Sequence, residues 1–314
     1  MKCLAALCAS LLMLSTADAL EPGEDVPVHA GPASHGEVTV RRLHATRELA
    51  AEHAARTAAS TNPNGVVLGY HGGRIMSHAV VKAIFWGPSW ANQSYAGDKV
   101  TGIDALYRGL GGSNYQKTSD EYSGTNGSVG SALSYQGHVV DTSKAAGGAD
   151  ANVIFAEVCR QVASGRIAPD TAGDGYYPVY TDVKRGSEKY CAWHGAGVCN
   201  GVAMQFAFFF SLDGDPSCDA HDRSTTHSPG LAALANVSAH ELSEARTDPG
   251  VPGGWSDASG AENGDKCAWT YNVNSVTLRD GGKWRLQGEW SNLAYDSGTG
   301  YPNAAGQRGC LDGH

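Results

Sequence analysis

Residues 231–247 read LAALANVSAHELSEART, and this stretch decides what the rest of the chain can be. Its apolar side chains recur at the three- and four-residue intervals of a helix; they are Leu231, Leu234, Val237 and Leu242. Asp248, Pro249 and Gly250 follow at once, and a proline cannot continue a helix. The stretch is therefore expected to form a helix that buries one face and ends at residue 247.

Within this helix, His240 and Glu244 are four residues apart and so lie on one face. An imidazole and a carboxylate at this spacing can bind one metal ion, as in the H-E-x-x-H helix of zincins, with Glu replacing the second His. Glu241 is then expected to be the catalytic residue that accepts a proton from a metal-activated water. The pattern is short, and a solvated helix face with two Glu and one His remains an alternative interpretation.

Residues after the helix strengthen the metal hypothesis. Glu262 lies 18 positions beyond Glu244, a spacing that suits a third ligand from a following element. Asp265 is expected to brace a ligand through a hydrogen bond. The histidine favours zinc, while a site rich in carboxylates keeps calcium as the alternative ion.

Two further histidines are candidates for the same site. His221 lies in a polar segment shortly before the helix, and His194 lies in the aromatic segment of residues 190–194. Either could supply an alternative ligand or a hydrogen bond to it. The competing interpretation is an ordinary loop histidine in each case.

Length, charge and motifs exclude several other classes. The chain has 314 residues and a net charge of −9, which argues against a nucleic-acid-binding protein. Hydrophobic residues make up 41%, enough for a sizeable core. The sequence contains neither the nucleophile elbow of serine hydrolases nor a phosphate-binding P-loop.

The N-terminus carries a pattern typical of export. Residues 1–19 combine Lys2, an apolar run and a small-residue cleavage site, which together predict a signal peptide. Residues 20–65 are expected to be an N-terminal segment and a candidate propeptide, with a helix over residues 40–60. We expect a secreted, extracellular protein without a membrane span, with the periplasm and the cell wall as alternative locations; the oligomeric state stays open.

Six cysteines follow the predicted signal peptide, namely Cys159, Cys191, Cys199, Cys218, Cys267 and Cys310. An even number in an exported chain predicts three disulfides. The pairs chosen are Cys191 with Cys199 and Cys267 with Cys310. Zinc ligation by cysteines is the alternative, although closely paired cysteines are missing.

Hydrophobic patterns predict a single mixed domain over residues 66–314. Strands are expected at residues 66–70, 79–86, 138–141, 176–182 and 202–212, and helices at residues 98–110, 151–164 and 231–247. Strands and helices that alternate in this way indicate an α/β or α+β fold. The predicted architecture is zincin-like: a short mixed sheet packed on a metal-bearing helix.

Several short motifs resemble the phosphate-induced or exordium family of secreted proteins. They are Tyr70-His71-Gly72-Gly73, the segment FWGPSW at residues 85–90, Cys191-Ala192-Trp193-His194, Thr247-Asp248-Pro249 and the segment LQGEWSN at residues 286–292. The resemblance implies a protein of the cell wall or extracellular space, and the His-Glu-x-x-Glu helix suggests a microbial branch.

Together these patterns predict a secreted zinc-dependent hydrolase, most simply a metallopeptidase, with a peptide or protein substrate. His240, Glu244 and Glu262 would hold the zinc. The alternative is a non-catalytic extracellular protein of the exordium type that binds a cell-wall polymer or another partner.

Overall fold

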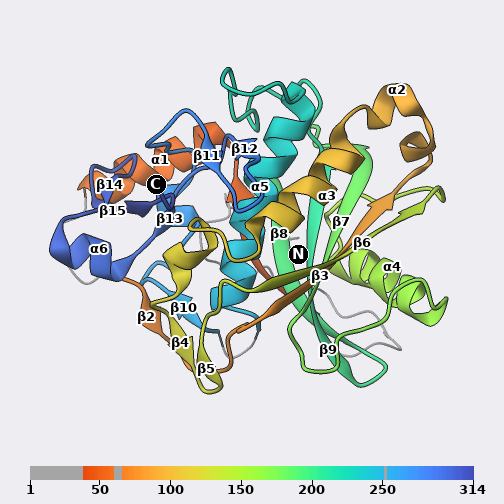
Figure 1. The fold of residues 1–314 in the computed structure, drawn as a ribbon, viewed down its shortest axis with the longest axis horizontal. Helices are drawn as coiled ribbons and strands as arrows, with labels where there is room; N and C mark the ends of the chain where they lie inside the picture. Colours follow the sequence, from red (N-terminus) through yellow and green to blue (C-terminus); the bar gives the residue numbers. More distant parts are fainter. Residues whose placement is uncertain (1–37, 60–65, 251–252) are drawn as a thin grey trace, which may run out of the picture.

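A six-stranded mixed sheet forms the centre of the fold in the computed structural model, which describes residues 38–59, 66–250 and 253–314 (Figure 1). In spatial order the strands are β1 (Thr39–Ala45), β8 (Tyr190–Cys199), β9 (Val202–Ser211), β7 (Gly175–Lys184), β3 (Ala79–Trp86) and β6 (Leu133–Asp141). The four strands from β9 to β6 run parallel, whereas β8 and β1 each pair antiparallel with their neighbours. The central strands are rich in β-branched and aromatic residues, which suit a sheet covered on both faces.

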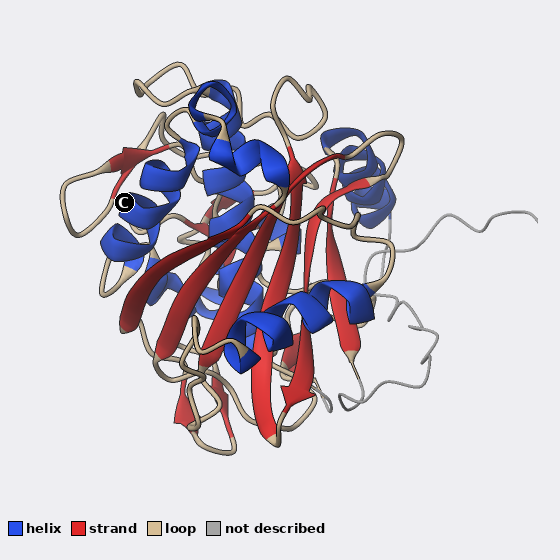
Figure 2. Ribbon diagram, turned by 90° about the vertical axis from the view of Figure 1, so that its right-hand side faces the viewer, coloured by secondary structure: helices blue, strands red, loops and turns tan. Residues whose placement is uncertain are grey.

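Helices cover both faces of this sheet (Figure 2). On one face lie α3 (Lys99–Leu110) and α5 (Pro229–Thr247), which contact each other, and α4 (Ala151–Ala163) covers the other face. Since side chains alternate along a strand, neighbours on β8 point to opposite helical layers. A Cβ at Gly197 would meet the ring of Phe155 from α4, so the even-numbered residues of β8 face α5.

The helix α5 is set by strong local signals at both ends. Ser228 caps it by accepting a hydrogen bond from the Leu231 amide, and Pro229 occupies its first turn. Every residue from Gly230 to Thr247 is buried. Polar side chains on this helix are therefore enclosed by protein, which excludes the predicted alternative of a solvated helix face.

The C-terminal third of the chain packs beside α5 as short elements. They are η4 (Asp265–Cys267), β11 (Val276–Thr277), β12 (Lys283–Trp284), β13 (Glu289–Trp290), α6 (Asn292–Ser297), β14 (Tyr301–Pro302) and β15 (Arg308–Leu311), with β10 (Trp255–Ser256) pairing β2 (Gly69–Tyr70). Trp290 and the Cys267–Cys310 disulfide lie in a second, smaller core.

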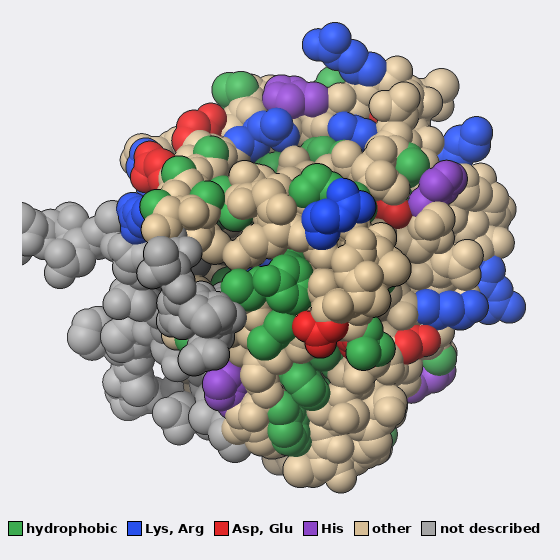
Figure 3. Space-filling view, turned by 90° about the vertical axis from the view of Figure 1, so that its left-hand side faces the viewer, with side chains coloured by type: hydrophobic (Ala, Val, Ile, Leu, Met, Phe, Trp, Pro, Cys, Tyr) green, Lys and Arg blue, Asp and Glu red, His purple; other side chains and the backbone are tan. Residues whose placement is uncertain are grey.

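The remaining elements connect these layers. They are α1 (Arg47–Ala59), η2 (Pro88–Ala91), α2 (Gln93–Ala96), η3 (Gln116–Ser119), β4 (Ser123–Gly124) and β5 (Gly127–Ser128). Among them, η3 is largely buried against α5 and β13. On the face shown in Figure 3, Lys and Arg side chains are scattered over the surface and do not form one patch.

Most predicted elements are present with small shifts at their ends, and two strands differ. The segment of residues 40–60, predicted as one helix, forms β1 and then α1, and β1 joins the main sheet. Residues 190–199, which were not among the predicted strands, form β8. Its Gly and Ala residues hide the strand pattern, and at Gly197 close contact with Phe155 of α4 leaves no room for a side chain.

The cysteine pairing differs from the prediction in part. Cys267 pairs with Cys310 as expected, but Cys191 pairs with Cys218. The predicted Cys191–Cys199 bridge is wrong because Cys191 and Cys199 lie at opposite ends of β8. Cys159 and Cys199 are buried free thiols, so the described residues form two disulfides and not the three that were predicted.

Residues 1–19, the predicted signal peptide, and most of the candidate propeptide lie outside the described residues. Among the helices that are described, none is both long and apolar enough to cross a membrane.

Candidate metal centre

The helix α5 and the strand β8 bring imidazoles and carboxylates together inside the fold. His240, Glu241 and Glu244 lie on α5, and His194 faces them from β8. His194 is 1% exposed and the other three are 0% exposed. Four ionisable side chains thus meet where water does not reach them.

Glu244 lies between the two imidazoles. Its Oε1 is 3.1 Å from His240 Nε2, and its Oε2 is 3.5 Å from His194 Nδ1. Glu241 Oε2 is 3.1 Å from the same His194 nitrogen. The i,i+4 pair predicted from the sequence is therefore close in space, and His194 joins it from the sheet.

The loop after α5 adds two more carboxylates. Glu262 Oε2 lies 3.7 Å from His194 Nε2, and Asp265 Oδ1 lies 3.9 Å from His240 Nε2. The Asp265 amide donates to Glu244 Oε1 at 3.0 Å and so fixes this carboxylate. A Cβ at Gly264 would lie 2.6 Å from His240 Nδ1, so the loop approaches the helix this closely only with glycine.

Gln287 is a site residue that the sequence did not single out. Its Nε2 lies 3.0 Å from His240 Nδ1 and donates to the Gly264 carbonyl at 2.9 Å. The backbone N–H of Gln287 donates to Asn236 Oδ1 on α5 at 2.8 Å. Gln287 therefore ties the imidazole, the loop and the helix together. Its position in the segment LQGEWSN is the only sequence signal that pointed near it.

His44 of β1 is the second residue missed from the sequence. Its ring centroid lies 3.9 Å from that of His240 and 4.7 Å from that of Trp269. The side chain is 0% exposed. The N-terminal strand thus covers the cluster from one side.

Electrostatics show that the cluster attracts positive charge. Burial alone would lower the pKa of His240, but the charge of Glu244 outweighs burial and raises this pKa to about 10. Burial would also lower the pKa of His194, but the charges of Glu262 and Glu241 outweigh this effect, so the pKa of His194 lies well above its usual range. Burial would raise the pKa of Glu244, yet His240 holds it well below its ordinary value. Without another cation, the imidazoles therefore take up protons to balance the buried carboxylates.

The donor atoms fit a metal ion by type, availability and spacing. His194 Nε2, His240 Nε2, Glu241 Oε1 and Glu244 Oε2 are buried and have no hydrogen-bond partner among the described residues. Ligand atoms of a tetrahedral zinc site with bonds of about 2.0–2.2 Å lie about 3.3–3.6 Å apart. The separations here run from 3.1 to 3.9 Å.

Two overlapping groups of residues could hold the ion. One is the fully buried set of His194, Glu241 and Glu244, and the other consists of His240, Glu244 and Asp265. Of the predicted ligands, His240 and Glu244 share a group, whereas Glu262 lies beside His194 and Asp265 takes the third place. These positions leave the identity of the metal open.

His221 lies away from this cluster. Its side chain is 52% exposed and contacts Asp219 of its own loop, with Nδ1 3.2 Å from Oδ2. The polar segment before α5 is tied to β8 by the Cys191–Cys218 disulfide. The structure therefore places the alternative candidate His194 in the cluster and leaves His221 at the surface.

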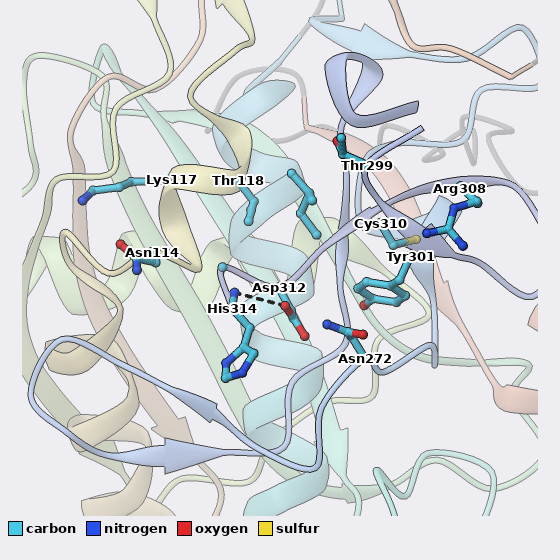
Figure 4. Close-up of a pocket in the computed structure, with 12 residues that line it drawn as sticks. Asn114, Lys117, Thr118, Asn272, Thr299, Tyr301, Arg308, Cys310, Asp312 and His314 are labelled. Atoms are coloured by element: carbon cyan, nitrogen blue, oxygen red, sulfur yellow. Dashed lines mark hydrogen bonds between the residues drawn. The ribbon is translucent and has the colours of Figure 1, made fainter. Parts of the chain in front are cut away.

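A cavity of about 510 Å³ opens elsewhere, near the C-terminus. Lys117, Arg308 and His314 line it together with the buried Asp312, which accepts a hydrogen bond from the His314 amide (Figure 4). None of the cluster residues described above lines this cavity. It is therefore separate from the candidate metal centre.

Comparisons of the chain with protein-family models, with curated proteins and with solved structures found no match. The resemblance to the exordium family accordingly rests on the sequence motifs alone.

Proposed function

We propose that this chain is a zinc-dependent hydrolase with a zincin-like arrangement of sheet and helix, and that its substrate is a peptide or protein. The observation that carries the proposal is the buried cluster of imidazole and carboxylate donors, spaced as ligands of one ion are spaced. Zinc is favoured over calcium because imidazole nitrogens on both sides of Glu244 suit zinc, whereas calcium takes oxygen ligands.

The ligands we propose are His240, Glu244 and Asp265. Access supports this choice, because Asp265 is 12% exposed and connects its group toward the surface, while the other group is sealed. When bound, zinc would supply Lewis acidity that polarises a carbonyl group and acidifies water.

Glu241 and His194 are proposed to move the proton. Glu241 Oε2 is held by His194 Nδ1 at 3.1 Å, so Oε1, which has no hydrogen-bond partner among the described residues, is the atom that accepts. Burial raises the pKa of Glu241, which makes its carboxylate a better base near neutral pH. The same oxygen would then protonate the leaving amine of a peptide.

The direct test is metal content combined with hydrolysis of a peptide library. We expect about one zinc per purified chain. His240→Ala should lose both the metal and the activity while remaining folded, because two disulfides and a large core support the domain. His221→Ala is the matched control, since its side chain is exposed and outside the cluster. Equal zinc in His240→Ala and the parent protein would overturn the ligand assignment.

A second candidate function follows from the burial of the cluster. The group of His194, Glu241 and Glu244 is 0–1% exposed, and a metal enclosed by such ligands is also typical of a structural site, which suits a non-catalytic binding protein of the exordium type. A chain that keeps its zinc and cleaves nothing across a broad library would favour this function.

We also propose that the protein is exported, and this proposal, like the resemblance to the exordium family, rests on sequence motifs. N-terminal sequencing of the protein recovered outside the cell should give Leu20 if residues 1–19 are a signal peptide. A start near Val66 would show that residues 20–65 are a cleaved propeptide.

A further inference from the structure

The candidate metal centre is enclosed, although a hydrolase must admit its substrate. His194, His240 and Glu244 are each at most 1% exposed. A polypeptide can reach them only if some covering segment leaves. Among the described residues, one segment that covers the cluster lies at the edge of the main sheet.

That segment is β1. It pairs antiparallel with β8 and forms the end of the main sheet, with Leu43 opposite Trp193 and His44 opposite Ala192. Ala192 and His194 are two residues apart, so they point to the same face. His44 consequently points toward α5, where its ring packs between His240 and Trp269.

Backbone hydrogen bonds attach β1 to the edge of the sheet, while Leu43 packs against the main core and His44 against the cluster. Besides the pairing with β8, the Thr46 amide donates to Lys189 O at 2.9 Å and Trp269 Nε1 donates to Ala45 O at 2.9 Å. None of the thirteen residues of the following helix α1, all of them described, is buried. The strand β8 is held independently by β9 and by the Cys191–Cys218 disulfide, so it does not depend on β1.

Among the described residues, the imidazole of His44 finds none of the hydrogen-bond partners that a buried polar side chain normally has. Both ring nitrogens are buried without a hydrogen-bond partner among the described residues. The space between His240 and Trp269 thus accommodates a flat ring by stacking alone, and phenylalanine or tyrosine has a ring of the same shape.

We propose that the outer edge of β8 is a binding site for an extended polypeptide, that the space between His240 and Trp269 receives one planar side chain of it, and that β1 with His44 occupies both. An added strand gains affinity from main-chain hydrogen bonds whatever its sequence, and side-chain pockets give the specificity. The site is then self-inhibited until β1 is displaced. That the polypeptide is a substrate rests on the proposed function; that it binds here does not.

Peptide binding to variants of the full chain tests this inference. The probe is a fluorescent peptide with the sequence of residues 38–46, VTVRRLHAT, followed by anisotropy. His44→Ala should bind it at least tenfold more tightly than the parent chain, because its own β1 competes less well. His78→Ala is the matched control, since its side chain is exposed, with Nε2 2.8 Å from Ser134 Oγ and away from β1. A probe with Phe at the His44 position should bind, and one with Ala there should bind at least tenfold more weakly.

Hydrogen exchange on the parent chain provides a test that needs no variant. The amides of β1 and those of β8 that pair with it should exchange together, at least tenfold faster than the amides of β9. Equal protection of β1 and β9, or no gain in probe binding by His44→Ala, would overturn the inference.

The outcomes separate this inference from the proposed function. Binding and exchange are measured without zinc or hydrolysis, so probe binding to a His44→Ala chain that cleaves nothing supports the binding edge and refutes only the hydrolase. Conversely, zinc-dependent hydrolysis that His44→Ala leaves unchanged would refute the self-inhibited site while the hydrolase stands.

Discussion

Glu241→Gln separates proton transfer from metal binding. The side chain is fully buried, with Oε2 3.1 Å from His194 Nδ1 and Oε1 without a hydrogen-bond partner among the described residues. Glutamine has nearly the same shape, and its oxygen can still accept a hydrogen bond from His194. Its amide nitrogen cannot take up a proton, so only the function of a base is removed.

The expected magnitude follows from this geometry. Loss of a general base lowers the rate by about 10² to 10⁴, or about 2.7–5.4 kcal/mol of transition-state stabilisation. The free energy of unfolding should change much less, because the substitution removes one of several neighbouring negative charges. The new amide nitrogen takes the place of Oε1, which has no hydrogen-bond partner among the described residues of the wild-type protein. The metal-free variant should therefore be at least as stable as the metal-free parent.

The assay compares zinc content, melting temperature and hydrolysis of a peptide library in Glu241→Gln and Glu244→Gln. Glu244 lies within 3.5 Å of a nitrogen of both His194 and His240, so its substitution should reduce metal content and activity together. Glu241→Gln should keep its zinc and lose turnover.

Two results would refute this reasoning. If Glu241→Gln loses zinc as Glu244→Gln does, Glu241 is a ligand, and the fully buried group with His194 holds the metal. If both variants retain wild-type hydrolysis, the cluster is not an active site.

Three further predictions concern stability, thiols and the loop. Burial raises the pKa of Glu289 to about 8, above its ordinary 4.5, so the folded state holds a proton that the unfolded state releases between these values. Stability should therefore fall by roughly 3 kcal/mol as the pH rises from 5 to 8, and Glu289→Gln should flatten this curve in urea titrations; an unchanged curve would contradict the assignment. Cys159 and Cys199 should give about two reactive thiols per unreduced chain after denaturation and essentially none before it, because both are buried; zero thiols in the denatured chain would indicate a third bridge. Gly264→Ala should weaken zinc binding at least tenfold, since its Cβ would lie 2.6 Å from the imidazole of the metal-binding helix, whereas at Gly147 the nearest atom to such a Cβ is 3.8 Å away. Zinc titration of the two alanine variants would show equal affinities if this contact did not matter.

Local signals account for the parts of the fold that the sequence predicted. The strand at residues 79–86 and the helix α5 carry their own periodicity, cap and stop residues, so neither depends on a distant partner for recognition. The pair of His240 and Glu244 follows directly from the geometry of that helix.

The remaining parts of the site depend on contacts between distant segments. The sequence left His194 open between a candidate for the site and a loop histidine, since Gly195 and Gly197 hide the strand pattern, and packing against Phe155 of α4 explains the second glycine. The choice between Glu262 and Asp265 depends on a short turn that glycine permits at residue 264. The spacing of residues in the sequence does not predict which side chain of such a turn points into the cluster.

Because the cluster is buried, the balance of its charges depends on the segments that cover it. Carboxylates taken out of water must be balanced by protons or by a metal ion, since an uncompensated buried charge costs several kcal/mol against a total stability of about 5–15 kcal/mol. His194 and His240 take up protons in the metal-free state, so zinc must displace protons to bind. With His44 packed on His240, both imidazoles are at most 1% exposed, and of the proposed ligands Asp265 alone reaches toward the surface. If β1 is displaced as we propose, water, ion and polypeptide would reach the imidazoles at one place, and a single edge strand would control all three.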